Sequence, residues 1–184
     1  MKIIIKSMGN EDYLAYLKPR LPSAVWCFDK YHDHMETFMR ALSMAGSGPA
    51  LHMEDDIILT RDFLTKVDEV VRRVGEGEVI QFFSLRPTDL TAGSRWDRAF
   101  MMNQCTYLPQ GLSGKLLEYS DSWRPRHPEH PTGSDVMLRD YLRASRKPYW
   151  LHVPSLVQHR EDVSNINPRR SKFRQSKTFV DPWL

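Results

Sequence analysis

The sequence has few of the features that mark secreted or membrane proteins. It holds only two cysteines, Cys27 and Cys105, both in apolar stretches, which is typical of reduced, buried thiols in a cytoplasmic protein. No apolar run approaches the roughly 20 residues needed to cross a bilayer. The N-terminal stretch MKIIIKSMGNEDY lacks a signal-peptide layout, because acidic residues follow its short apolar run too soon. We therefore expect a cytoplasmic protein without a membrane span.

A glycine-rich phosphate loop of the G-x-G-x-x-G kind is also missing, so the common dinucleotide-binding fingerprint does not apply. The length of 184 residues is enough for one domain with a real core. The excess positive charge is confined to one end: residues 168–184 hold five basic residues against one acidic residue, whereas the whole chain carries only +3. Such a basic tail is typical of a solvated end or of an arm that binds phosphates, a diphosphate or nucleic acid.

Short apolar runs alternate with amphipathic stretches along the first half of the chain. We predict strands at 2–6, 23–28, 50–53, 79–85, 99–108 and 149–157, and helices over 35–42, 63–74, 111–123 and 134–145. Thr60 and Ser134 are the N-caps expected for the second and fourth helices. The alternation favours a largely parallel α/β sheet with helices on both faces.

Three consecutive carboxylates, Glu54, Asp55 and Asp56, interrupt the apolar run ALHMEDDIIL at 50–59. Acidic residues are poor strand formers and costly to bury unpaired. They follow a predicted strand directly, and ligands of such sheets bind at the carboxyl ends of the strands. A hard cation such as Mg²⁺ or Mn²⁺ would neutralise them. The alternative is a plain surface turn that caps the next helix. We take His52, on the opposite face from Met53, as structural.

The stretch ALHMEDDIILTRDF resembles the acidic metal motif of GT-A-fold glycosyltransferases, in the form hydrophobic–E–D–D–hydrophobic followed by a helix with a Phe. It is most similar to small bacterial and phage enzymes that resemble glycosyltransferase family 25. The stretches HMETFMRAL, NQCTYLPQGLSGKLL and VPSLVQHREDVSNI agree in order and spacing. The resemblance implies a single-domain, GT-A-like α/β core with a mixed, mostly parallel sheet over residues 1–166, followed by a basic tail at 167–184.

The resemblance also implies a metal site. In these folds the acidic motif holds a divalent ion, Mn²⁺ or Mg²⁺, that bridges the two phosphates of a nucleoside-diphosphate sugar. Carried over, Asp56 and His159 would be metal ligands, whereas Glu54 and Asp55 would contact ribose, sugar or metal-bound water. A UDP-sugar is the donor we expect.

Further residues follow from the same resemblance and from the topology. Asp135, at the start of a predicted helix, matches the base that takes the acceptor's proton in an inverting reaction, and the helix N-terminus would keep it ionised. Asp140 is the alternative. The first two strand ends would place Ser7, Asp29 and Lys30 near the nucleoside. The diphosphate would be covered, as by a lid, by Arg160, Ser164, Arg169 and Arg170.

Basic and aromatic residues share the predicted loops 86–98 and 124–133, including Trp96 and Arg126, and Trp123 directly precedes the second loop. This mixture suits either a saccharide or DNA with a hydroxylated base as acceptor, the latter as in phage DNA modification. Two other functions stay open: a metal-dependent phosphoesterase or nuclease, and a non-catalytic nucleic-acid-binding module. No pattern in the sequence specifies the oligomeric state.

Overall fold

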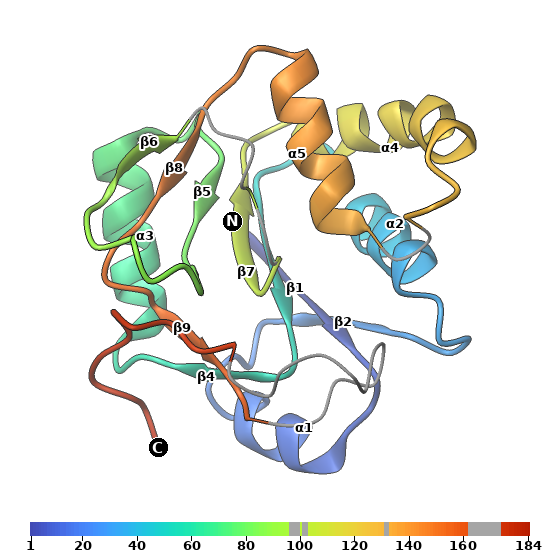
Figure 1. The fold of residues 1–184 in the computed structure, drawn as a ribbon. Coiled ribbons are helices and arrows are strands. Elements are labelled where there is room, and N and C mark those ends of the chain that lie inside the picture. Colours follow the sequence, from blue (N-terminus) through green and yellow to red (C-terminus); the bar gives the residue numbers. More distant parts are fainter. Residues whose placement is uncertain (96–99, 101–102, 131–132, 162–173) are drawn as a thin grey trace.

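The computed structural model describes residues 1–95, 100, 103–130, 133–161 and 174–184. These residues form a central sheet with strand order β2-β1-β3-β7-β5-β8-β6 and a small sheet of β4 and β9 (Figure 1). The central strands are β1 (Lys2–Ser7), β2 (Val25–Phe28), β3 (Ala50–Glu54), β5 (Ile80–Gln81), β6 (Gly93–Arg95), β7 (Cys105–Leu108) and β8 (Tyr149–Leu151). The small sheet joins β4 (Ile57–Leu59) to β9 (Val157–His159). In the described chain no helix has the length and apolar character needed to span a membrane.

The central sheet is mixed but mostly parallel. Strands β1, β2 and β3 run parallel to one another. Strand β7 lies antiparallel between β3 and β5, β8 is parallel to β5, and β6 is antiparallel to β8. Five of the seven strands therefore point the same way, and the predicted α/β class with a mixed, mostly parallel sheet is confirmed.

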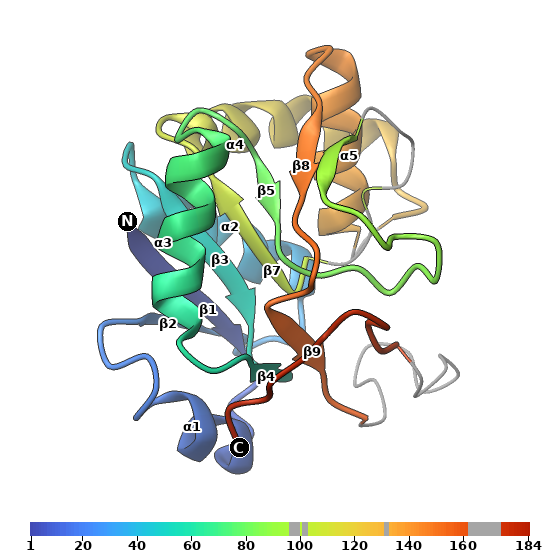
Figure 2. The ribbon, with the colours of Figure 1, turned by 90° about the vertical axis from the view of Figure 1, so that its left-hand side faces the viewer.

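Helices cover both faces of this sheet. Helix α3 (Phe63–Val74) packs on one face, and α2 (His34–Ala45), α4 (Leu112–Trp123) and α5 (Ser134–Ala144) pack on the other (Figures 1 and 2). The alternation along β1 explains the two layers: Ile3 and Ile5 join the core under α3, whereas Ile4 joins the small cluster under α2. The short helices α1 (Glu11–Leu17) and η1 (Arg124–Arg126) complete the elements.

Several predicted element bounds are wrong, for reasons of tertiary structure. Only Ile80–Gln81 of the 79–85 run pairs as a strand, and 149–157 divides into β8 and β9, which belong to different sheets. Thr60 does not cap α3, because its hydroxyl donates to the backbone oxygen of Val180, 3.1 Å away. Ser134 does not cap α5 either, since Gly133 is the N-cap. The sequence patterns did not predict helix α1, whose N-cap is Asn10.

The described C-terminal residues, 174–184, pack back against the β4–β9 sheet (Figure 2). The Trp183 backbone N–H donates to Leu59 O at 2.7 Å, and the Tyr16 hydroxyl on α1 donates to Trp183 O at 2.8 Å. This segment therefore ties α1 to the small sheet. The predicted boundary between residues 166 and 167 lies outside the described residues.

His52 is structural, as expected. It lies in β3, is 2% exposed, and packs edge-on against Phe38. Among the described residues neither ring nitrogen has a hydrogen-bond partner. Burial, together with the nearby Lys6 charge, lowers the pKa of His52 to about 3. His52 is therefore neutral in the folded protein at neutral pH.

This lowered pKa predicts acid sensitivity that His52→Met should remove. At pH values below the ordinary pKa of histidine, His52 binds a proton in the unfolded chain but not in the folded protein. The free energy of unfolding therefore falls as the pH falls. The free energy of unfolding of the wild type should drop by about 2 kcal/mol more than that of the variant between about pH 7.5 and about pH 5. Urea unfolding at the two pH values measures this, and parallel losses in both proteins would contradict it.

Candidate functional site

The acidic triplet lies at the carboxyl edge of the sheet, where strands β1, β2 and β3 end together. The register pairs Ser7 with Phe28 and Lys6 with Glu54. Strand β9 reaches the same edge through its pairing with β4, which sets Ile57 opposite His159. Figure 1 shows β4 and β9 at this end of the sheet, beside α1. Segments far apart in the sequence thus meet here.

Glu54 is neutralised by a buried lysine. Lys6, on the neighbouring strand β1, is 2% exposed and forms a close ion pair with Glu54 Oε1. The Lys6 Nζ also lies 4.9 Å above the ring of Phe38. Because its charge is already paired within the sheet, Glu54 has less need of a cation than its neighbours.

Asp55 is held by hydrogen bonds rather than by an opposite charge. Its Oδ2 accepts from the Ser7 hydroxyl at 2.6 Å and from the Met8 backbone N–H at 3.2 Å. Burial raises the pKa of Asp55 to about 6, helped by the charges of Asp56 and Glu54 and opposed by the Ser7 and Met8 hydrogen bonds. This carboxyl therefore titrates about two pH units above an ordinary aspartate, near pH 6.

Asp56 faces His159. His159 Nε2 lies 3.1 Å from Asp56 Oδ2, with the histidine side chain 3% exposed and the aspartate 33% exposed. Burial alone would raise the pKa of Asp56, but His159 and the Arg174 charge outweigh it and hold the pKa below its usual range. Asp56 is therefore ionised.

The proton on His159 is fixed by its other ring nitrogen. Nδ1 lies 2.5 Å from the Arg160 backbone oxygen, and a carbonyl can only accept, so Nδ1 carries the proton. In neutral His159, Nε2 then presents a lone pair to a carboxylate oxygen. Within the described chain, Asp56 Oδ1 is buried and has no hydrogen-bond partner, and Nε2 faces Asp56 Oδ2 alone, at 3.1 Å. Either a second proton or a cation must separate these electron-rich atoms.

These atoms fit a divalent cation with few protein ligands. Carboxylate oxygen and imidazole nitrogen both suit Mn²⁺, and the histidine is oriented by a backbone carbonyl in the manner common for metal ligands. Within the described ranges, no group of three or more histidine, cysteine or acidic side chains is arranged to hold a metal. The remaining ligands would therefore have to be water or substrate phosphates, as is usual for ions of this kind.

Arg160 follows His159 directly. Its backbone N–H donates to Asp56 O at 2.9 Å, which locks β9 against the acidic triplet. Its guanidinium lies over the rings of Tyr13 and Tyr16 of α1, 5.0 and 4.9 Å from their centroids. Ser164, Arg169 and Arg170, which we predicted near the diphosphate, lie outside the described residues. Arg174, whose charge acts on Asp56, was not predicted.

Asp135 lies in the first turn of α5. Its neighbour Ser134 contacts His34 of α2, with Nε2 and Oγ 3.0 Å apart. Burial lowers the pKa of His34, while the charges of Glu54 and Asp135 oppose this shift. His34 therefore lies within electrostatic reach of both the acidic triplet and the predicted base.

Asp29 and Lys30 follow β2 at this edge. The Asp29 backbone N–H donates to Ser7 O at 2.7 Å, and its side-chain Oδ1 accepts from the backbone N–H groups of Tyr31 and Asp33 at 3.2 and 3.1 Å. Asp29 thus shapes the loop into α2, and Lys30 is exposed. The structure places Ser7, Asp29, the triplet, His159 and Arg160 at one edge, and their roles stay predictions.

The sequence predictions missed Lys6, His34 and Arg174. Pairing β1 with β3 would have found Lys6, because a lysine at the end of an isoleucine strand must meet a partner on the adjacent strand. His34 is the first residue of α2, and the preceding Asp33 caps this helix by accepting from the Glu36 N–H at 2.9 Å. Its contact with Ser134 is long-range and leaves no local pattern.

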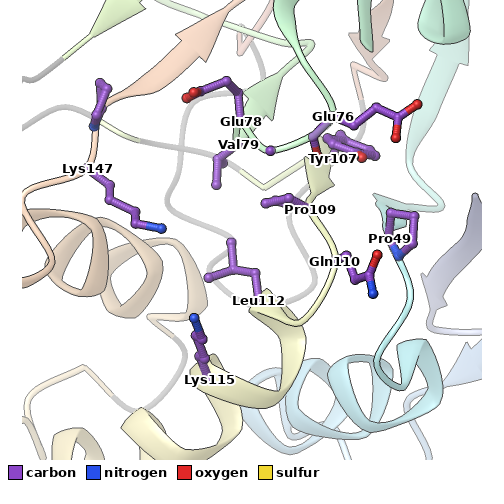
Figure 3. Close-up of a pocket in the computed structure, with 12 residues that line it drawn as sticks. Pro49, Glu76, Glu78, Val79, Tyr107, Pro109, Gln110, Leu112, Lys115 and Lys147 are labelled. Atoms are coloured by element: carbon purple, nitrogen blue, oxygen red, sulfur yellow. Dashed lines mark hydrogen bonds between the residues drawn. The ribbon is translucent and has the colours of Figure 1, made fainter. Parts of the chain in front are cut away.

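A cavity of about 430 Å³ lies at the opposite end of the sheet, away from the carboxylates (Figure 3). Its walls include Val79 and Leu112, and the charged residues Glu78, Lys147 and Lys115 lie around it. Glu76 also lines the cavity, and all four charged side chains, two acidic and two basic, are exposed. This cavity contains none of the predicted site residues.

No family model matches the chain, and no curated protein matches it. Among solved structures, the crystal structure of A197 from STIV is similar with a TM-score of 0.49 and 13% sequence identity, over 86% of this chain and 84% of that chain. At this level the similarity says nothing about activity, so the functional conclusion depends on the site itself.

Proposed function

We propose that this protein is a metal-dependent glycosyltransferase that moves a sugar from a nucleoside-diphosphate sugar, most simply a UDP-sugar, to an acceptor hydroxyl. One observation carries the proposal: Asp56 and His159, from segments far apart in the chain, meet at 3.1 Å at the carboxyl edge of the sheet. These are the two residues that the GT-A resemblance assigns to the metal. The mixed α/β sheet is consistent with a GT-A-fold glycosyltransferase.

Asp56 and His159 would hold the divalent ion, which acts as a Lewis acid toward the leaving diphosphate when bound. The chain's own residues prepare this site. Lys6 pairs with Glu54, Ser7 and Met8 hold Asp55, and the Arg160 carbonyl orients the His159 ring. Asp56 Oδ1 and His159 Nε2 are among the buried side-chain atoms of the described residues that lack a hydrogen bond.

Asp135 would accept the proton of the acceptor hydroxyl in an inverting transfer. It lies in the first turn of α5, where the helix dipole favours the ionised carboxylate by about 0.3–1 kcal/mol. Its Oδ1 also accepts from the Val136 N–H at 3.0 Å, which orients the group. The acceptor itself is a saccharide or a hydroxylated DNA base, and the site does not select between them.

A donor screen tests the proposal. Thermal unfolding is measured with UDP-glucose, UDP-N-acetylglucosamine and GDP-mannose, each with and without Mn²⁺. We expect one sugar nucleotide to raise the melting temperature only when Mn²⁺ is present, because ligand binding to the folded state stabilises it. UMP, which lacks the pyrophosphate, is the matched control and should give no Mn²⁺-dependent rise.

The rival functions give different results. A nuclease would cleave a plasmid with Mn²⁺ and show no preference for nucleoside diphosphates. A binding module would bind DNA equally well after Asp56→Ala. Either result, together with no Mn²⁺-dependent response to any sugar nucleotide, would overturn the proposal.

A further inference from the structure

A small hollow lies between helix α5 and the edge strand β6, which stand side by side in Figure 2. Within the described chain its lining contains no carboxylate. The lining contains a group of cationic residues, here called the basic surface: Arg95 of β6, Arg139 and Arg143 of α5, and Lys147, which follows α5. The free volume of about 10 Å³ is too small to enclose a small molecule, whose sites usually measure about 300–1,000 Å³. A ligand must therefore lie across this surface.

Most of the charge on the basic surface is uncompensated. Arg143 and Lys147 are exposed, and among the described residues neither side chain has a hydrogen-bond or ion-pair partner. Arg95 donates from Nη2 to a backbone oxygen at 2.7 Å, which orients its guanidinium without neutralising the charge. Arg139, by contrast, is paired with Asp140, with Nη2 and Oδ1 2.9 Å apart. A surface with several unpaired charges of one sign favours a polyanion as its ligand.

Nearby acidic residues leave this charge available. Glu76 and Glu78 line the larger cavity together with Lys147, yet among the described residues no ion pair joins either glutamate to the lysine. The Asp140 carboxylate is engaged by Arg139 and also accepts from Trp123 Nε1 at 3.1 Å. The cations that face solvent are therefore free to bind an external anion.

The cations on α5 lie in line with the proposed base. Asp135, Arg139 and Arg143 recur every four residues, so they share one face of the helix. The distance from Asp135 to Arg143 along the helix axis is about 12 Å. A phosphate chain bound at Arg143 and Lys147 would thus lie within about one helix length of the group that accepts the acceptor's proton.

We infer that the basic surface binds the phosphate backbone of double-stranded DNA. Phe100 and Tyr149, the aromatic residues of the hollow, are buried and present no ring for the base stacking that single strands use. Among the described residues, none of the exposed large apolar side chains lines the hollow, whereas a membrane-binding surface needs such side chains. Resting on the proposed function, the inference makes DNA with a hydroxylated base, rather than a saccharide, the acceptor.

Binding is measured in EDTA by the anisotropy of a fluorescein-labelled DNA duplex of about two helical turns, roughly 20 base pairs, over a range of salt concentrations. Arg143→Gln and Lys147→Gln should each lower the slope of log affinity against log salt by about one. The double variant should bind about tenfold more weakly or worse. The matched control, Lys18→Gln with Arg72→Gln, removes two exposed cations elsewhere and should bind like the wild type. Thermal unfolding confirms that each variant folds.

Four results would overturn the inference: no binding of the duplex, binding that the folded double variant retains in full, equal losses in the double variant and its control, or tighter binding of a single strand of the same length. Vesicles of phosphatidylcholine and phosphatidylserine should not bind, and vesicle binding without duplex binding would also contradict it.

The measurement uses no donor and no divalent ion, so it does not depend on Asp56 or His159. DNA binding without any sugar transfer would overturn the proposed function and leave the basic surface in place as a DNA site. Transfer to a saccharide without DNA binding would overturn the inference and leave the proposed function in place. The two failures are therefore distinguishable.

Discussion

Replacing Asp56 with Asn should lower kcat/KM for sugar transfer roughly 100- to 1000-fold, because metal stabilisation of the leaving group supplies several kcal/mol. Asn keeps the shape of the side chain but removes the negative charge that faces His159 at 3.1 Å. The loss should appear with the donor identified by the screen and at saturating Mn²⁺. Steady-state kinetics with the wild type and the variant measure it.

Asp68→Asn is the matched control for that variant, since Asp68 is an exposed carboxylate on α3, outside the site. It should leave kcat/KM unchanged. Both variants should melt as cooperatively as the wild type. If Asp56→Asn retains full transfer activity, Asp56 does not hold the metal.

Replacing Lys6 with Met should cost about 3 kcal/mol or more of folding free energy, because it leaves the charge of Glu54 unpaired. Lys6 is 2% exposed, and Glu54 lies beside two further carboxylates. The loss is therefore larger than for an exposed ion pair, which is worth at most about 1 kcal/mol. Denaturant unfolding at neutral pH gives the difference.

The double variant Lys6→Met, Glu54→Gln isolates the charge effect. Removing both charges should recover most of the stability lost in the single variant, since no unpaired carboxylate remains. Lys18→Met, at an exposed lysine, should change stability little. A single Lys6→Met variant as stable as the wild type would contradict the assigned pairing.

The fold was predictable where a sequence pattern and burial agree. Helices α2 and α3 present repeated apolar side chains to one face, and the structure buries Phe38 and Leu42 in one and Phe63 and Val67 in the other. The position of the triplet after β3 was also predictable, because parallel strands end at a common edge. These features depend on local periodicity, which a single sequence shows.

The failures come from long-range contacts. Thr60 bonds to the C-terminal segment and Ser134 to His34 of α2, so neither hydroxyl is available to cap its own helix. The pairing of Lys6 with Glu54 depends on the β1–β3 register. By contrast, Asp56 and His159 were predicted together through a family resemblance, since composition and spacing alone do not bring two distant residues to one edge.

We propose that Asp56 and His159 would hold a divalent cation together with the donor's pyrophosphate. Calorimetric titration of Mn²⁺ in the presence of UDP tests it most directly. The wild type should bind one Mn²⁺, and Asp56→Asn and His159→Asn should each bind it at least about tenfold more weakly while remaining folded. Equal Mn²⁺ affinity in the wild type and both folded variants would contradict the account.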